Sequence, residues 1–395
     1  MMQAMDRTLI IDCNKKVRED VKIAGFVQTR RDHGKITFLD VSDRSGLIQV
    51  VTNIGKDLHP QDAVAIFGKV NKRPENLINK NIPTGEIEIY SEKVEVLSKA
   101  AQLPFDMGGK DLDLQLPTLL DFRSLTLRHP KMKFIFKVQE AVLAGFRKAA
   151  LDLGCTEIVV PTIVAGATEG GAEVFKIDYF NYKAYLSQSP QLYKQMLVPV
   201  FERVFTIAKA YRAEPSVTTR HLTETTQLDC EFGFVEFADL LNLLEEVALS
   251  MIKYAEKKCQ VDKILYGKIP RLTLREAQEV IFKVFNRDNR KEKDLTPQDE
   301  INLCKWAKEK HHSDFVTITH FPTVAKPFYT KPDPKNLEYS LSYDLLFRGV
   351  EILSGSQRVN DYDQLVKAIE ERGMDPKDFE MYLQAFKFGM PPEGG

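Results

Sequence analysis

Residues 211–224, Tyr-Arg-Ala-Glu-Pro-Ser-Val-Thr-Thr-Arg-His-Leu-Thr-Glu, are the densest group of chemically active side chains in the chain. Strand-like apolar runs over 204–208 and 228–234 flank them, which predicts a polar loop between two strands. Arginines in such a loop suit a polyphosphate, and carboxylates suit a bound metal ion or the amino group of a base. A solvated hairpin tip also carries charges of both signs, so the residue types alone leave both interpretations open.

Four other stretches accompany this loop in order along the chain. They are Val160-Pro161 after a predicted helix, Thr-Glu-Gly-Gly-Ala at 168–172, Gln-Ser-Pro-Gln-Leu-Tyr-Lys-Gln at 188–195 and Glu-Ile-Leu-Ser-Gly-Ser-Gln-Arg at 351–358. With 211–224, they resemble the motifs of class II aminoacyl-tRNA synthetases, in the form used by the aspartyl and asparaginyl enzymes. The resemblance extends over roughly residues 15–395 and is closest to the compact archaeal and eukaryotic type.

The resemblance implies roles for single residues in ATP binding. Arg212 would contact the α-phosphate and the substrate carboxylate, and Arg212 and Glu351 would be the catalytic residues. The residues implied to bind ATP are Arg212, Glu214, Arg220, His221, Leu222 and Glu351. Glu351 and Ser354, three positions apart, would ligate Mg²⁺, which prefers oxygen ligands.

The resemblance also implies an aspartate site, made of Glu169, Gln191, Lys194, Arg212, Ser354 and Arg358. In the aspartyl branch two cations, here Lys194 and Arg358, meet the side-chain carboxylate, whereas the asparaginyl branch usually lacks the lysine. We therefore expect aspartate to be preferred, on the argument that asparagine would leave both cations unpaired in a dry pocket.

The N-terminal part is predicted to be a small closed barrel. Strand-like runs over 21–30, 36–41, 47–52, 63–70 and 86–97 are separated by turn residues. Five short strands fit an oligonucleotide-binding barrel, although the strand count alone does not select that fold. By the resemblance, Phe38 would stack on an anticodon base, and Arg31, Gln49 and Glu88 would read base edges.

The rest of the chain predicts an α+β domain with an antiparallel sheet, because strands come in runs with helices between them. We expect helices from Pro130 to about Ala150, over about 238–257 and within 271–312, and a strand over 157–161. The expected organisation is an anticodon-binding barrel over 1–100, an irregular hinge over 101–129 and a class II catalytic domain over 130–395. Homodimers would form through the first motif around Pro161.

Bulk composition adds few constraints. The net charge is −1 and five cysteines are scattered without metal-ligand spacing, which indicates a reduced, cytoplasmic protein without a zinc site. The sequence shows no signal pattern and no apolar run long enough for a membrane span, so no membrane partner is expected.

Three positions depart from the family pattern. Thr225 stands where an aromatic residue commonly stacks on adenine, and Glu393 stands where histidine is frequent. The sequence ends at Gly395, where the family continues into its third motif, so we expect a truncated chain with a weakened adenine site.

The expected function is an aspartate–tRNA ligase that forms aspartyl-adenylate from L-aspartate and ATP and transfers the aspartyl group to tRNA(Asp). The resemblance leaves open whether tRNA(Asn) is charged as well. The alternatives are an asparaginyl-tRNA synthetase and a non-catalytic, tRNA-binding paralogue.

Overall fold

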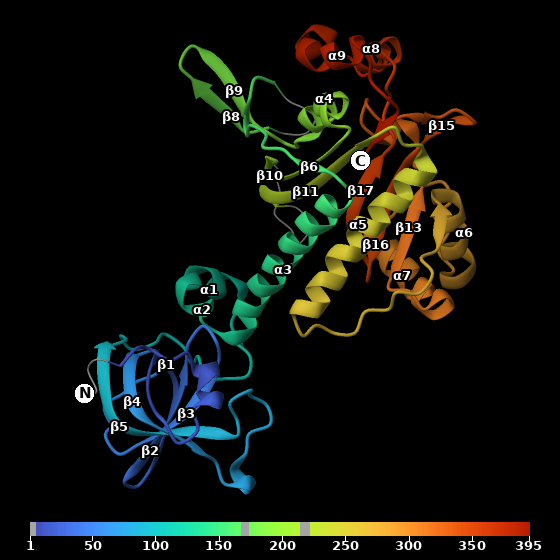
Figure 1. Ribbon diagram of the computed structural model, residues 1–395. Coiled ribbons are helices and arrows are strands. Elements are labelled where there is room, and N and C mark those ends of the chain that lie inside the picture. The colour runs from blue at the N-terminus through green and yellow to red at the C-terminus, as the bar shows by residue number, and fades with distance from the viewer. Residues whose placement is uncertain (1–4, 167–173, 214–221) are drawn as a thin grey trace. The chain divides into compact units, whose positions relative to one another are not determined.

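The computed structural model describes residues 5–166, 174–213 and 222–395 (Figure 1). The chain divides into two compact units, one ending at Ile135 and the other spanning Phe136–Gly395. The division falls within helix α3 (Pro130–Asp152).

The first unit is a closed five-stranded barrel, which confirms the expected fold. Its strands follow the order β1-β2-β3-β5-β4, with β1 hydrogen-bonded to β4 to close the barrel and β3 parallel to β5. The strands are β1 (Asp20–His33), β2 (Ile36–Ser42), β3 (Leu47–Thr52), β4 (Ala63–Lys72) and β5 (Ile87–Ser98), and short 3₁₀ helices lie at Ile10–Lys15 and Glu75–Leu77.

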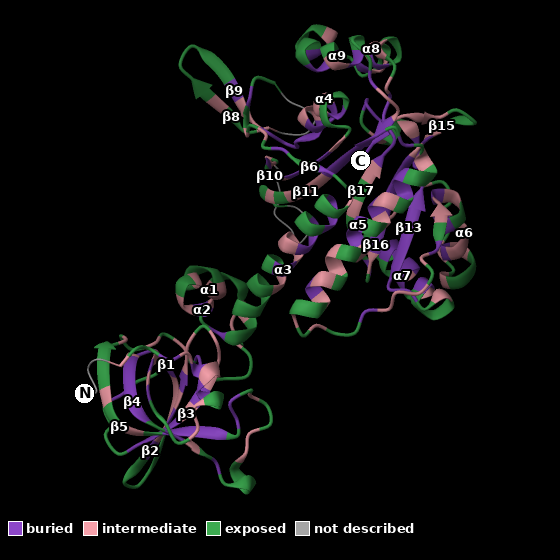
Figure 2. Ribbon diagram, viewed as in Figure 1, coloured by how far each residue is buried: buried purple, intermediate pink, exposed green. Residues whose placement is uncertain are grey.

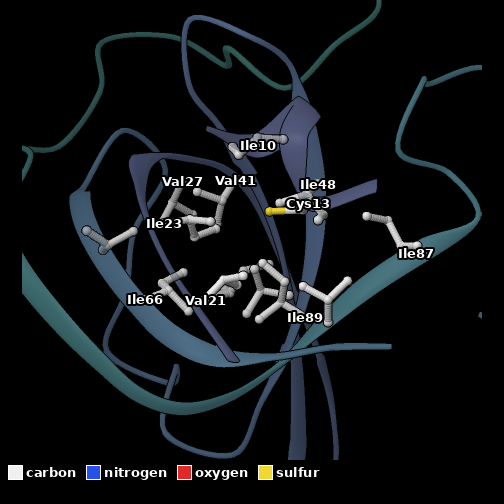
Figure 3. Close-up of a cluster of buried hydrophobic side chains, with 14 of the residues drawn as sticks. Ile10, Cys13, Val21, Ile23, Val27, Val41, Ile48, Ile66, Ile87 and Ile89 are labelled. Atoms are coloured by element: carbon white, nitrogen blue, oxygen red, sulfur yellow. The ribbon is translucent and has the colours of Figure 1, made fainter. Parts of the chain in front are cut away.

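Alternation along the strands creates the barrel core. In β2, Thr37, Leu39 and Val41 are buried, whereas Phe38 and Asp40 between them remain accessible on the outer face. Each fully buried apolar side chain contributes about 1.5–3 kcal/mol of transfer free energy. Figure 3 shows this core, which includes Ile10, Cys13, Val21, Ile23, Val27, Val41, Ile48, Ile66, Ile87 and Ile89.

The segment expected to be an irregular hinge contains two short helices, α1 (Leu116–Asp121) and α2 (Arg123–Thr126). Pro117 lies in the first turn of α1, where the missing backbone N–H costs nothing. The prolines and glycines of 101–129 all lie between Pro104 and Pro117, so the part of the segment after Pro117 is free to form helices.

The second unit contains two four-stranded sheets that are mainly antiparallel, as expected. One has the order β18-β11-β10-β6 and the other the order β12-β13-β16-β17, and a bridge between Gln357 and Gly394 connects them. The strands of the first sheet are β6 (Thr156–Glu157), β10 (Arg203–Tyr211), β11 (Glu224–Gly233) and β18 (Glu393–Gly394). Those of the second are β12 (Arg271–Thr273), β13 (Phe315–Thr319), β16 (Ser342–Phe347) and β17 (Val350–Ser356).

Two smaller sheets complete the strands of this unit. They consist of β7 (Ile163–Val164), β8 (Lys176–Tyr179) and β9 (Tyr182–Leu186), and of β14 (Pro332–Asp333) and β15 (Asn336–Ser340). Figure 2 shows most of β13 and β16 as buried, in keeping with their apolar sequences.

Helices α3 and α5 share one hydrophobic core with β10 and β11, which contains Phe146 of α3, Phe205 and Phe232 of the strands and Leu240 and Leu244 of α5. The remaining helices are α4 (Gln191–Phe201), α5 (Phe237–Lys258), α6 (Leu274–Phe285), α7 (Pro297–His311), α8 (Tyr362–Glu371) and α9 (Glu380–Lys387), with 3₁₀ turns at Thr323–Ala325 and Pro376–Phe379. The helices expected from periodicity at α3, α5, α6 and α7 are confirmed.

The strand expected over 157–161 is wrong beyond Glu157. Its apolar residues do not form a paired ladder among the described residues: Ile158 donates one hydrogen bond to Phe205, and Val159 is 97% exposed. Pro161, which has no N–H to donate, then ends any pairing in this direction. Within the described residues, no helix is both long and apolar enough to cross a membrane.

Candidate active site

Strand β11 carries two carboxylates, the half-buried Asp229 and the buried Glu231, on the face away from the α3–α5 core. Cys230 and Phe232 point into that core, and because side chains alternate along a strand, Asp229 and Glu231 point to the opposite face. Helix α4 packs on β10 and β11 and brings Lys194 to these carboxylates. The Lys194 Nζ lies 2.8 Å from the Asp229 Oδ1 and 3.0 Å from the Glu231 Oε2.

Arg358, two residues after the end of β17, reaches the Glu231 carboxylate from the sheet that contains β17. Its Nε donates to the Glu231 Oε1 at 2.7 Å, and its terminal nitrogens donate to Ser356 at 2.7 Å and to Gln191 at 3.1 Å. Lys194, Arg358 and Gln191 are all buried. The fold therefore brings together three of the residues implied for the aspartate site.

The charges in this cluster hold each other ionised. Burial alone would raise the pKa of Glu231, but the charges of Arg358 and Lys194 outweigh it and lower that pKa to about 2. Burial alone would lower the pKa of Lys194, and Asp229 and Glu231 reverse the effect and raise it. The sequence argument that asparagine would leave both cations unpaired is therefore wrong in its premise, because each cation already has a carboxylate partner.

A second carboxylate pair lies on β16 and β17. Asp344 is opposite Ser354 in the strand register, and the Ser354 hydroxyl donates to the Asp344 Oδ1 at 2.6 Å. Lys326 lies 3.4 Å from the same carboxylate. Burial and the charge of Asp344 raise the pKa of Glu351 to about 7, although Glu351 is accessible to solvent. Two carboxylates whose pKa values rise together form a site that a cation would stabilise.

Other residues implied by the sequence are only partly placed. Arg212 follows β10, is exposed and has its backbone N–H bonded to the Thr223 carbonyl at 3.0 Å; Leu222 is exposed as well. Thr225 pairs with Ala210 across the two strands. Glu169, Glu214, Arg220 and His221 lie outside the described residues.

In the barrel, the four residues implied for anticodon binding are connected across neighbouring strands. Arg31 is paired with Phe38 in the strand register and binds the Asp40 carboxylate at 3.1 Å. Gln49 lies opposite both Asp40 and Glu88 and donates to the Glu88 Oε2 at 2.9 Å. The ring of Phe38 is half-buried and meets the ring of His33 edge-on, with 5.5 Å between the two ring centroids. The group of Arg31, Phe38, Asp40, Gln49 and Glu88 is called here the Phe38 face, and within it Glu88 is buried.

Sequence reasoning missed Asp229, Glu231, Asp344 and Asp40. The signal for the first two was present as Leu-Asp-Cys-Glu-Phe at 228–232, where charged residues alternate with apolar ones in a predicted strand. Asp344 is a single charged residue among mainly apolar ones in Ser-Tyr-Asp-Leu-Leu-Phe at 342–347.

Comparison with known proteins agrees with the geometry. Residues 115–395 match the family model "tRNA synthetases class II (D, K and N)", and residues 21–97 match "OB-fold nucleic acid binding domain". The fold and site thus define a class II aminoacyl-tRNA synthetase, an ATP-using enzyme whose substrates are an amino acid and tRNA.

The chain is 39% identical to the aspartate–tRNA(Asp/Asn) ligase of Thermus thermophilus, over 98% of this chain and 92% of that protein. It is 38% identical to the aspartate–tRNA(Asp) ligase of Pyrococcus abyssi, over 95% and 88%. The chain belongs to the aspartate–tRNA ligase family.

Solved structures from both branches are similar to this one. Asparaginyl-tRNA synthetase from Pyrococcus horikoshii, complexed with asparaginyl-adenylate, has a TM-score of 0.86 at 30% identity and covers 98% of this chain and 92% of its own. A putative aspartyl-tRNA synthetase from Leishmania major has a TM-score of 0.86 at 25% identity, over 100% of this chain and 90% of its own. The backbone is thus common to both branches, and the choice of amino acid depends on side chains.

Proposed function

We propose that the chain activates L-aspartate with ATP and transfers the aspartyl group to the 3′ end of tRNA(Asp). The observation that carries the choice of aspartate is the buried contact of Lys194 and Arg358 with β11. Lysine and arginine only donate hydrogen bonds. A carboxylate, which only accepts, fits such a pocket, whereas the amide NH₂ of asparagine would face donors.

Lys194 keeps one donor for the substrate. The ammonium group has three N–H donors, and within the described residues Asp229 and Glu231 account for two of them. Leaving the NH₂ of asparagine without an acceptor costs about 1–3 kcal/mol, so the pocket discriminates through an unsatisfied donor. This replaces the argument from unpaired cations.

The test compares the two amino acids directly. In ATP–pyrophosphate exchange and in calorimetry, aspartate is expected to be preferred by roughly 10–100-fold, the equivalent of the donor penalty. Equal affinity and equal exchange with asparagine would contradict the assignment.

For ATP, the residues proposed are Arg212, Glu214, Arg220, His221, Leu222 and Glu351, and Glu169 is proposed to hold the substrate amino group. Arg212 is accessible to a ligand beyond the end of β10. A preorganised donor near the α-phosphate stabilises the charge that develops there when the aspartate carboxylate attacks phosphorus.

Mg²⁺ fits the residues of β16 and β17. Among the described residues no group of three His, Cys, Asp or Glu side chains is arranged as a complete metal site. Asp344, Glu351 and Ser354 nevertheless supply oxygen atoms. Burial raises the pKa of Asp344, and burial and the charge of Asp344 raise that of Glu351. A bound Mg²⁺ would share its remaining coordination positions with phosphate oxygens and neutralise their charge.

A homodimer through the segment around Pro161 is supported by exposed apolar surface. Val159 is 97%, Ile163 54% and Leu151 53% exposed. They flank β6, an edge strand of its sheet. Exposed apolar residues beside an unpaired edge are typical of a surface that another chain covers.

The Phe38 face is proposed to bind the anticodon. We expect Phe38→Ala and Gln49→Ala to weaken charging of tRNA(Asp) by about 1–3 kcal/mol each, since stacking and base-edge contacts have this size. Amino-acid activation should be almost unchanged, because these residues belong to the barrel unit.

Aminoacylation kinetics and ATP–pyrophosphate exchange on the same preparations check this. Leu97→Ala, which removes a 57% exposed side chain from the end of β5, is the matched control. Unchanged charging by both variants would exclude the Phe38 face as the anticodon site.

A further inference from the structure

A third carboxyl group, that of Glu393 in β18, is completely buried beside the cations of the proposed aspartate site. Its strand pairs with β11, and its backbone carbonyl accepts a hydrogen bond from the Arg358 N–H at 2.9 Å. Its Oε1 accepts from the Gln195 Nε2 at 2.7 Å. Its Oε2 has no donor within the described part of the chain.

A second carboxyl group, that of Glu231, belongs to the same buried cluster. Strands β11 and β18 are paired, and Arg358 bonds to the Glu231 side chain and to the Glu393 backbone. Two carboxyl groups buried together favour a proton on one of them, and because Arg358 and Lys194 hold Glu231 ionised, the proton belongs on Glu393. Burial and the charge of Glu231 raise the pKa of Glu393 well above its usual range.

The other polar side chains near Glu393 are Gln195 and tyrosines, which do not supply a positive charge in place of the proton on Glu393. Gln195 lies between Glu393 and α9, where its Oε1 accepts from the Tyr382 hydroxyl at 3.1 Å and from Gln191 at 2.9 Å. Tyr382, Tyr329 and Tyr343 are further titratable groups near Glu393 or Arg358, and burial raises the pKa of Tyr382 and that of Tyr343 well above the usual value.

The proton on Glu393 keeps the proposed aspartate pocket free of excess negative charge. Lys194 and Arg358 compensate Asp229 and Glu231 one for one. An ionised Glu393 would leave the pocket with an excess negative charge, and an aspartate side chain would add a second. A neutral Glu393 leaves the pocket balanced, so that the substrate carboxylate meets no net repulsion.

We propose that Glu393 keeps a proton shared with Glu231 while the pocket accepts aspartate, so that aspartate binding is linked to this proton and asparagine binding is much less so. The inference rests on the proposed function and adds a specificity-determining residue to it. Aspartate affinity is retained while the pair holds its proton and is lost as the pH rises and the proton leaves. The neutral side chain of asparagine is affected far less by the added charge.

The experiment measures the dissociation constants of both amino acids by calorimetry from about pH 6 to about pH 10, for the wild type and Glu393→Gln. The wild type should lose up to about tenfold in aspartate affinity per pH unit once the pair deprotonates. Glu393→Gln, whose side chain stays neutral at every pH of the series, should show no such loss. Ionisation of the ligand's own amino group is the same for both proteins and cancels in the comparison.

Glu380→Gln, the same change at an exposed position of α9, is the control and should follow the wild type. Parallel profiles of the wild type and Glu393→Gln would overturn the proposal. Failure of the wild type to bind aspartate, or a preference for asparagine at every pH, would instead contradict the proposed function.

A second measurement does not depend on the folding of the variant. Calorimetry of the wild type in buffers of different ionisation enthalpy should show proton uptake on aspartate binding in the pH range where affinity falls, and much less on asparagine binding. Equal proton uptake for the two amino acids would also overturn the proposal.

Discussion

Lys194→Leu is expected to abolish measurable aspartate binding and to destabilise the catalytic unit by about 3–5 kcal/mol. The ammonium group is buried between Asp229 and Glu231, so its removal leaves two carboxylates without one of their counter-charges. Their desolvation is then uncompensated, which is the costly case for a buried ion pair. Chemical denaturation measures the stability, and calorimetry measures the binding.

Lys148→Leu is the matched control, because Lys148 forms an exposed pair with Asp152 on α3 at 2.6 Å. Its loss should cost no more than about 0.5 kcal/mol. Adding Asp229→Asn to Lys194→Leu should recover part of the stability without restoring aspartate binding, because Arg358 still compensates Glu231. A Lys194→Leu protein with full stability and affinity would show that the buried cluster carries neither property.

Arg212→Ala is expected to lower the rate of adenylate formation by about 10²–10³-fold, the usual effect of removing one donor that stabilises transition-state charge. Arg212→Lys should recover only part of this rate, since lysine keeps the charge but loses the planar, two-pronged donor. Stability should change little, because the residue is exposed. ATP–pyrophosphate exchange at saturating aspartate measures the effect.

Arg290→Ala provides the comparison for Arg212, because Arg290 is exposed and paired with Asp288 at 2.9 Å in the loop before α7. It should leave exchange unchanged. Exchange at the wild-type rate in Arg212→Ala would remove this residue from the catalytic step and would require another group at the α-phosphate.

Much of the architecture follows from local sequence. The barrel strands are rich in apolar residues with partial alternation and have turn residues between them, and α5 and α6 have apolar residues at helical spacing. Both periodicities arise within a few consecutive residues, so they are readable before the chain folds. The prediction of a strand over 157–161 is wrong because its apolar residues match the pattern, whereas no strand in the described part of the chain pairs with it beyond Glu157.

The sequence by itself also determined the family and the identities of the proposed substrate-binding residues, because these are carried by short motifs. It did not determine how charges combine. Lys194, Glu231, Arg358 and Glu393 lie far apart along the chain, and only the packing of α4, β11 and β18 makes them one buried cluster. Burial strengthens electrostatic interactions, so the protonation of each group depends on neighbours that tertiary structure supplies. For that reason the two cations of the pocket, Lys194 and Arg358, could be named from sequence, whereas their carboxylate partners and the charge of the pocket could not.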